Sequence, residues 1–98
     1  MINHSHPLPS RSYSNLYDIL AKVQDSKSME SFLKDLCTPQ ELEVLASRWE
    51  VVLLLEEGHS YRKIHEKCGA SLATITRVAK SLKYGTGGYK EFYKYMNR

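Results

Sequence analysis

Two short helices joined by a tight turn are encoded by the stretch SYRKIHEKCGASLATITRVAKSLK, residues Ser60–Lys83. Ser60 and Ser71 each precede a run of helical periodicity, and serine is favoured at the start of a helix. Gly69 lies between the runs, where a helix-turn-helix needs a left-handed residue to reverse the chain. His65 occupies a position where a small residue is usual. The spacing predicts a helix-turn-helix at about residues 60–83, with packing between Ile64, Cys68, Ala70, Ile75 and Val78.

The second of these helices has two chemically different faces. Its inward stripe consists of Ile75, Val78, Ala79 and Leu82. Its outward stripe has small residues first and cations later: Ala73, Thr76, Arg77, Lys80 and Lys83. That order suits docking in the DNA major groove, where the start of a helix approaches base edges and flanking cations contact phosphates. The cations of the preceding helix are expected to contact phosphates as well: Arg62, Lys63 and Lys67. An ordinary solvated face is the alternative.

The charge of the chain is unevenly distributed along its 98 residues, whose formal net charge is +3. Residues 1–57 carry five lysines and arginines against nine acids, whereas residues 58–98 carry nine against two. This asymmetry indicates an acidic scaffold joined to a basic end, which favours an anionic partner such as nucleic acid. A solvated basic surface without a partner is again the alternative.

The remaining segments also show helical patterns, so the chain is expected to be all-α with about six helices. Residues 1–11 are predicted to be a flexible N-terminal arm, whose His4 and His6 are expected to be solvated rather than bound to a metal. Residues 12–98 are predicted to form a single helical domain. One helix starts at Ser12 and is followed by a break at Asp25–Ser28 and a second, shorter helix. The last helix is predicted over Tyr89–Arg98, after glycines that end the preceding helix, and its aromatic side chains are expected in the core or a dimer contact.

The third helix has the clearest boundaries. Thr38-Pro39-Gln40-Glu41 combines an N-cap threonine, a proline at the first helical position and a glutamate at the capping-box position, and Gly58 marks the end. Around Trp49–Leu55 the helix is apolar on nearly every side. A small chain can hardly bury such a helix alone, so we expect a second copy to cover it in a homodimer. The alternative is a central helix surrounded by its own short neighbours.

Several stretches of Leu36–Lys83 resemble the Trp repressor superfamily, in particular its YerC/YecD-type branch. The matching stretches are Cys37–Glu41, Ala46–Arg48, Leu55–Gly58, Gly69–Arg77 and Ser81–Lys83. The resemblance implies an intertwined homodimer with two helix-turn-helix heads that contact two half-sites of a double-stranded DNA operator, about 34 Å apart. It implies that Leu72, Ala73 and Thr76 approach the bases, with phosphate contacts from Arg62 and Lys83. By family analogy the regulator is expected to be a repressor.

The same resemblance implies an effector pocket formed by Thr38, Arg48, Thr74, Arg77, Val78 and Ser81. In tryptophan-dependent members, two arginines at the positions of Arg48 and Arg77 sandwich the indole, and the next residue is glycine. Here Val78 occupies that position, and its branched side chain should fill the volume that the indole needs. We therefore expect that L-tryptophan is not the corepressor and that any effector is a different one. A tryptophan-responsive repressor is the alternative.

Other classes of function fit the sequence less well. No arrangement of nucleophile, base and orienting group indicates an enzyme, no cofactor is expected, and His65 with Cys68 supplies too few ligands for a metal site. The longest apolar run, Val51–Leu55, is far shorter than the roughly 20 residues of a membrane span, so no membrane partner is expected. The two widely spaced cysteines favour a cytoplasmic location. A protein-interaction module that reuses the fold remains as the second candidate, and salt-sensitive binding would distinguish DNA binding from it.

Overall fold

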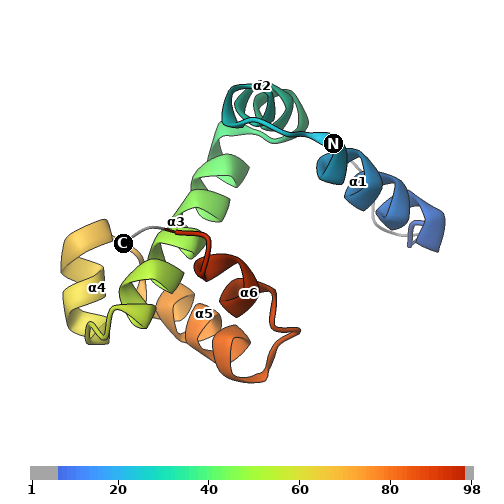
Figure 1. The fold of residues 1–98 in the computed structure, drawn as a ribbon. Helices are drawn as coiled ribbons and strands as arrows, with labels where there is room; N and C mark the ends of the chain where they lie inside the picture. Colours follow the sequence, from blue (N-terminus) through green and yellow to red (C-terminus); the bar gives the residue numbers. More distant parts are fainter. Residues whose placement is uncertain (1–6, 97–98) are drawn as a thin grey trace. The chain divides into compact units, whose positions relative to one another are not determined.

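The computed structural model describes residues 7–96, in which the regular structure is entirely α-helical (Figure 1). Its helices are α1 (Ser10–Lys22), α2 (Ser26–Leu36), α3 (Pro39–Glu56), α4 (Tyr61–Cys68), α5 (Leu72–Tyr84) and α6 (Gly88–Tyr93). The all-α class with a helix-turn-helix is thus confirmed. The chain divides into two compact units, Met1–Cys37 and Thr38–Arg98, which are described separately below.

The first unit contains α1 and α2, both of which start earlier than the sequence predicted. Ser10 and Arg11 belong to α1, so the predicted arm is too long at its C-terminal end, and its residues 1–6, with His4 and His6, lie outside the described part of the chain. The predicted break is shorter because Asp25 caps α2, accepting bonds from the Ser28 amide (2.7 Å) and hydroxyl (3.0 Å). These hydrogen bonds hold the pKa of Asp25 below its ordinary value.

Both helices of this unit are amphipathic and leave their apolar side chains accessible. No residue of α1 or α2 is buried, although each helix carries a clear apolar stripe. Large apolar side chains that are about half exposed or more include Tyr13, Tyr17, Ile19 and Leu36. An amphipathic helix normally gains its stability by packing its apolar face, so these faces have the composition of a buried surface without being buried here.

The second unit is organised around α3, whose start is fixed by the predicted capping box. The Thr38 hydroxyl accepts a hydrogen bond from the Glu41 amide at 3.1 Å, and the Glu41 carboxylate accepts one from the Thr38 amide at 2.8 Å. Two amides that a helix start leaves unpaired are thereby satisfied. Pro39 follows at the first helical position, where the missing N–H costs nothing.

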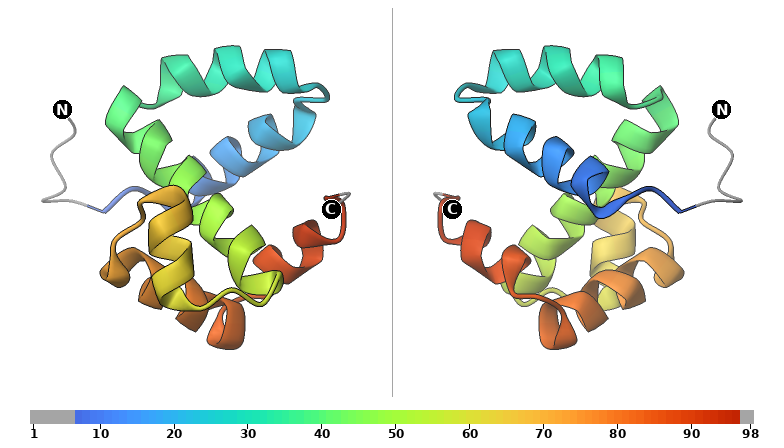
Figure 2. Two further views of the ribbon diagram at one scale, coloured as in Figure 1. Left: turned by 90° about the vertical axis from the view of Figure 1, so that its left-hand side faces the viewer. Right: turned by 90° about the vertical axis from the view of Figure 1, so that its right-hand side faces the viewer.

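The core of this unit surrounds the C-terminal half of α3, against which α4, α5 and α6 pack (Figure 1, Figure 2). Four consecutive residues of α3 are buried: Val51, Val52, Leu53 and Leu54. Side chains on successive residues point to different sides of a helix, so three neighbouring helices cover this segment all round. The expectation that a second copy covers this segment is therefore wrong for Val51–Leu54, which the short neighbouring helices of the same chain bury. The apolar side chains left exposed on α3 lie nearer its start, at Val44 and Leu45.

The helix-turn-helix has the geometry that its sequence predicts. Ser60 and Ser71 cap α4 and α5, each accepting a hydrogen bond at 3.1 Å from the amide three residues later. Gly69 ends α4 with φ at +76°, in the left-handed region that favours glycine. Ile64 and Ile75 are fully buried, and Ala70 and Val78 are at most 5% exposed, so the two helices pack together as expected.

The end of α5 is turned tightly toward α6. The Gly85 amide donates a hydrogen bond to the Ser81 carbonyl at 2.8 Å, and a side chain at Gly85 would lie against that same carbonyl. The helix α6 then runs only to Tyr93, not to the predicted end of the chain. Beyond it Tyr95 is 73% exposed, so its side chain contributes little burial that would favour a longer helix. Lys90 joins α6 to the end of α3 through an ion pair with Glu56 at 3.6 Å.

None of the helices within residues 7–96 combines the length and apolar character required to span a membrane.

Replacing Gly85 by alanine should destabilise the second unit by about 1–3 kcal/mol, because the new methyl group overlaps the Ser81 backbone. Gly88→Ala is a matched control, since a Cβ there would meet only the Thr86 hydroxyl, at 3.9 Å. The control should be neutral or slightly stabilising. Chemical denaturation followed by circular dichroism would measure the free energy of unfolding of both variants. Equal stability of the two variants would contradict the tight turn at the end of α5.

Candidate nucleic-acid interface

The helix α5 presents one buried and one exposed face, divided as the sequence predicts. Ile75 is fully buried and Val78 is 1% exposed, and both belong to the core cluster. The residues predicted to face DNA from this helix are all exposed: Leu72, Ala73, Thr76, Arg77, Lys80 and Lys83. Leu72 is 65% exposed at the first position of the helix. The small side chains lie on the first two turns, and the lysines lie on the later turns.

Cations on α4 extend this basic surface. Arg62 and Lys63 share a single acid, Glu66, at 3.5 and 4.0 Å. The Arg62 side chain is 90% exposed, so this ion pair is weak and leaves the guanidinium able to exchange the carboxylate for a phosphate. Glu66 is the only acid in the sequence of α4 and α5. The two helices together therefore carry a predominantly positive exposed surface, which suits a polyanion.

A hollow of about 340 Å³ lies where α4 meets the start of α5. Its lining combines predicted DNA-facing residues with others: Tyr61, Arg62, His65, Leu72 and Ile75. Tyr61 is 41% exposed and borders this hollow. The His65 ring spans the turn, with Nδ1 at 2.8 Å from the carbonyl oxygen of Ala70. The sequence marks His65 only as larger than usual for a helix crossing, and because the residue is exposed its size is accommodated at the surface of the turn.

The residues predicted to form an effector pocket do not line one common hollow. Thr38 is engaged in the capping box of α3. Val78 packs in the core with Val51 and Val52, so its side chain fills the space beside α3. Neither Arg48 nor Arg77 forms an ion pair with another described residue.

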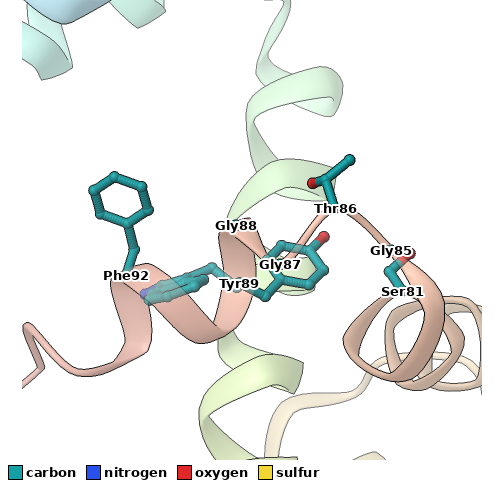
Figure 3. Close-up of a pocket in the computed structure, with 8 residues that line it drawn as sticks. Ser81, Gly85, Thr86, Gly87, Gly88, Tyr89 and Phe92 are labelled. Atoms are coloured by element: carbon teal, nitrogen blue, oxygen red, sulfur yellow. The ribbon is translucent and has the colours of Figure 1, made fainter.

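Thr74 and Ser81 border two different hollows. Thr74 belongs to one of about 350 Å³, between the first half of α3 and the turn before α5. Ser81 belongs to one of about 540 Å³, between the end of α5 and the start of α6. The larger hollow is lined by Trp49, Ser81, Gly85, Thr86, Gly87, Gly88, Tyr89 and Phe92. Figure 3 shows Tyr89 and Phe92 projecting from α6 and Ser81 on the side of α5.

The aromatic lining of the larger hollow was not predicted as a site. The Trp49 and Tyr89 ring centroids lie 6.3 Å apart with a 47° tilt, an ordinary aromatic contact. A run of glycines followed by aromatic residues is the only sequence signal for it, and that signal equally describes a turn before a packed helix. Within residues 7–96, no three histidine, cysteine, aspartate or glutamate side chains are grouped so that they could hold a metal ion.

Comparisons with known proteins agree with one another. The family model described as Trp repressor protein matches residues 11–97. A Bacillus subtilis protein named YerC is 39% identical over 85% of this chain and 80% of its own length. A Trp operon repressor homolog of Chlamydia caviae is 33% identical over 88% of this chain and 86% of its own. The crystal structure of a TrpR-like protein from Eubacterium eligens, 36% identical, superposes with a TM-score of 0.84 over 90% of this chain and 91% of that chain.

Proposed function

The chain belongs to the Trp repressor family, and from this membership we propose that it is a sequence-specific, double-stranded DNA-binding transcriptional regulator of the cytoplasm. It acts as a homodimer whose two helix-turn-helix heads contact the half-sites of an operator, and it represses transcription without L-tryptophan. The proposed base-contacting residues are Leu72, Ala73 and Thr76, and the proposed phosphate contacts come from Arg62, Lys63, Arg77, Lys80 and Lys83.

One observation supports this function most directly: the exposed face of α5 changes from small to cationic side chains along the helix. Ala73 and Thr76 are short enough to let the start of α5 approach base edges, and Thr76 can hydrogen-bond a base or contact a thymine methyl group. Lys80 and Lys83 have long side chains that can contact the flanking phosphates. A face that served only as a solvated surface would not need this order.

The homodimer is supported by the exposed apolar faces rather than by the buried segment of α3. Accessible apolar side chains occur on several helices, at Tyr13, Tyr17, Ile19, Leu36, Val44, Leu45 and Phe92. Amphipathic helices whose apolar stripes are left uncovered are typical of an association interface. In a two-fold dimer the recognition helices lie about 34 Å apart, which matches one turn of DNA.

A protein-interaction module that uses the same fold is the second candidate, favoured by the exposed Leu72 and the hollow beside it. Salt separates the two candidates. Binding through phosphates weakens steeply with ionic strength because counterions are released from DNA, whereas binding through an apolar hollow does not.

The proposed function is tested by selecting binders from a random-sequence duplex library at two salt concentrations and sequencing the retained DNA. We expect enrichment of a palindrome with half-sites about one helical turn apart, and retention that falls as salt rises. Failure to enrich any sequence with folded protein, together with salt-independent retention, would favour the interaction module.

Thr76 and Lys83 should affect DNA binding in different ways. Thr76→Ala should reduce discrimination against a mismatched half-site base by about 1–3 kcal/mol. Lys83→Ala should weaken binding to all duplexes alike and lower the salt slope by about two, one for each protomer of the dimer. Lys34→Ala is the control for net charge, since it also removes one cation but from α2. There the Glu30 carboxylate pairs with the Lys34 ammonium at 2.7 Å and raises its pKa. Fluorescence anisotropy on the selected and a scrambled duplex would measure all three. Equal effects of Thr76→Ala and Lys83→Ala would contradict the division between base and phosphate contacts.

L-tryptophan should not bind the dimer with a dissociation constant below about 1 mM, because Val78 is packed in the core where an indole would need space. Isothermal titration calorimetry measures this directly. The variant Val78→Gly, which lacks the side chain that fills this space, is titrated with L-tryptophan in the same way. It should lose about 3 kcal/mol of stability, so its titration is carried out at low temperature. Tight, stoichiometric binding of tryptophan by the unmodified protein would overturn the prediction.

A further inference from the structure

The turn of the helix-turn-helix is held by two hydrogen bonds that both involve His65. The Gly69 amide donates to the His65 carbonyl at 2.9 Å, as expected at the end of a helix. In addition, Nδ1 of the His65 ring lies 2.8 Å from the carbonyl oxygen of Ala70. The ring therefore connects the body of α4 to the residue directly before Ser71, the N-cap of α5.

The direction of the second bond follows from its chemistry. A carbonyl oxygen can only accept, so Nδ1 must carry the proton and donate. The neutral ring is thereby fixed as the Nδ1–H tautomer, and a protonated ring donates from the same atom. Among the described residues, no other group donates to the Ala70 carbonyl. Ala70 is only 5% exposed with the ring in place, while His65 itself is exposed, so the bond lies at the edge of the core.

This bond acts on the part of the protein where position matters most for the proposed function. Ala70 precedes Leu72, the first residue of α5, by only two positions, and the His65 ring borders the same hollow as Leu72 and Arg62. Leu72, Ala73 and Thr76 have short side chains, so their contacts with base edges require the helix start to be placed accurately. Lys80 and Lys83 are long and flexible, and they can follow a phosphate through a small displacement of the helix.

We propose that His65 is a positioning residue for sequence recognition: its Nδ1–H bond to the Ala70 carbonyl fixes the turn, and thereby sets how the start of α5 meets the bases. This inference rests on the proposed function. Loss of the bond reduces discrimination between operator and random DNA, and it leaves the affinity for random DNA nearly unchanged because the phosphate contacts remain.

Three variants separate this role from a general effect on stability. His65→Asn places an amide donor near the position of Nδ1, His65→Gln places its donor one carbon further out, and His65→Ala has none. The ratio of affinities for the library-selected duplex and a scrambled duplex is measured by anisotropy below the melting temperature of each variant. We expect the ratio to fall about tenfold for the Gln and Ala variants and to stay within about threefold for the Asn variant.

Helix propensity distinguishes the two amide variants further, because glutamine is a better helix former than asparagine. A purely structural role within α4 predicts that the Gln variant performs better than the Asn variant, which is the opposite order. Equal ratios for all variants, or a Gln variant better than the Asn variant, would overturn the proposal.

Nitrogen-15 NMR of the imidazole in the unmodified protein gives a readout that does not depend on DNA. At a pH where the ring is neutral, we expect the Nδ1–H tautomer, and an Nε2–H tautomer would overturn the hydrogen bond. If the tautomer is Nδ1–H but the unmodified protein enriches no sequence, then the DNA-binding function fails with the bond intact. That result overturns the role of His65 in recognition. It is distinguishable from a failure of the His65–Ala70 hydrogen bond, which the Nε2–H tautomer would show.

Discussion

The packing of α5 against the C-terminal half of α3 is the constraint on which the second unit depends. Ile75 and Val78 are buried in one cluster with Val51, Val52 and Ile64, and these five residues come from three helices, α3, α4 and α5. The helix α5 buries one face and leaves the other in solvent, so fixing the buried face also fixes which of its side chains are presented to solvent. The exposed small and cationic stripe of α5 is therefore a direct consequence of how the core is filled, because each position given to the core determines the positions left outside it.

Core packing alone does not set where the helix starts, and local hydrogen bonds around the turn supply that information. Ser60 and Ser71 define the first residues of α4 and α5, and Gly69 supplies the left-handed conformation that lets the helices follow each other so closely. The bond from His65 to Ala70 adds a constraint between the side chain of one helix and the entry to the next. Apolar contacts are non-directional, whereas these bonds are directional, so the turn contributes orientation where the core contributes most of the stability.

The features predicted correctly here depend on residues close together in the sequence, and the features that were missed depend on contacts between distant segments. The capping box at Thr38, the glycine at Gly69 and the two faces of α5 depend on residues a few positions apart, and each was predicted from spacing alone. The covering of Val51–Leu54 depends on helices later in the chain, and the sequence pattern does not show that three short helices suffice to bury it. The hollow beside Trp49 was missed for the same reason, since its lining joins α3 to a loop more than thirty residues later.

The position of Val78 joins the stability of the core to the mode of regulation. A glycine there would leave unfilled volume next to α3, and a ligand that filled it would contribute contacts that the protein lacks by itself. Val78 supplies those contacts from the chain, since it is 1% exposed and packs with the buried valines of α3. A ligand can shift an equilibrium only by the difference in its affinity for the two states. Under the proposed function, Val78 already occupies this volume, so L-tryptophan has no such difference to contribute at this position. Under the proposed function, α5 is therefore held ready for DNA by the protein's own core, and operator binding depends on dimer formation and ionic strength rather than on tryptophan.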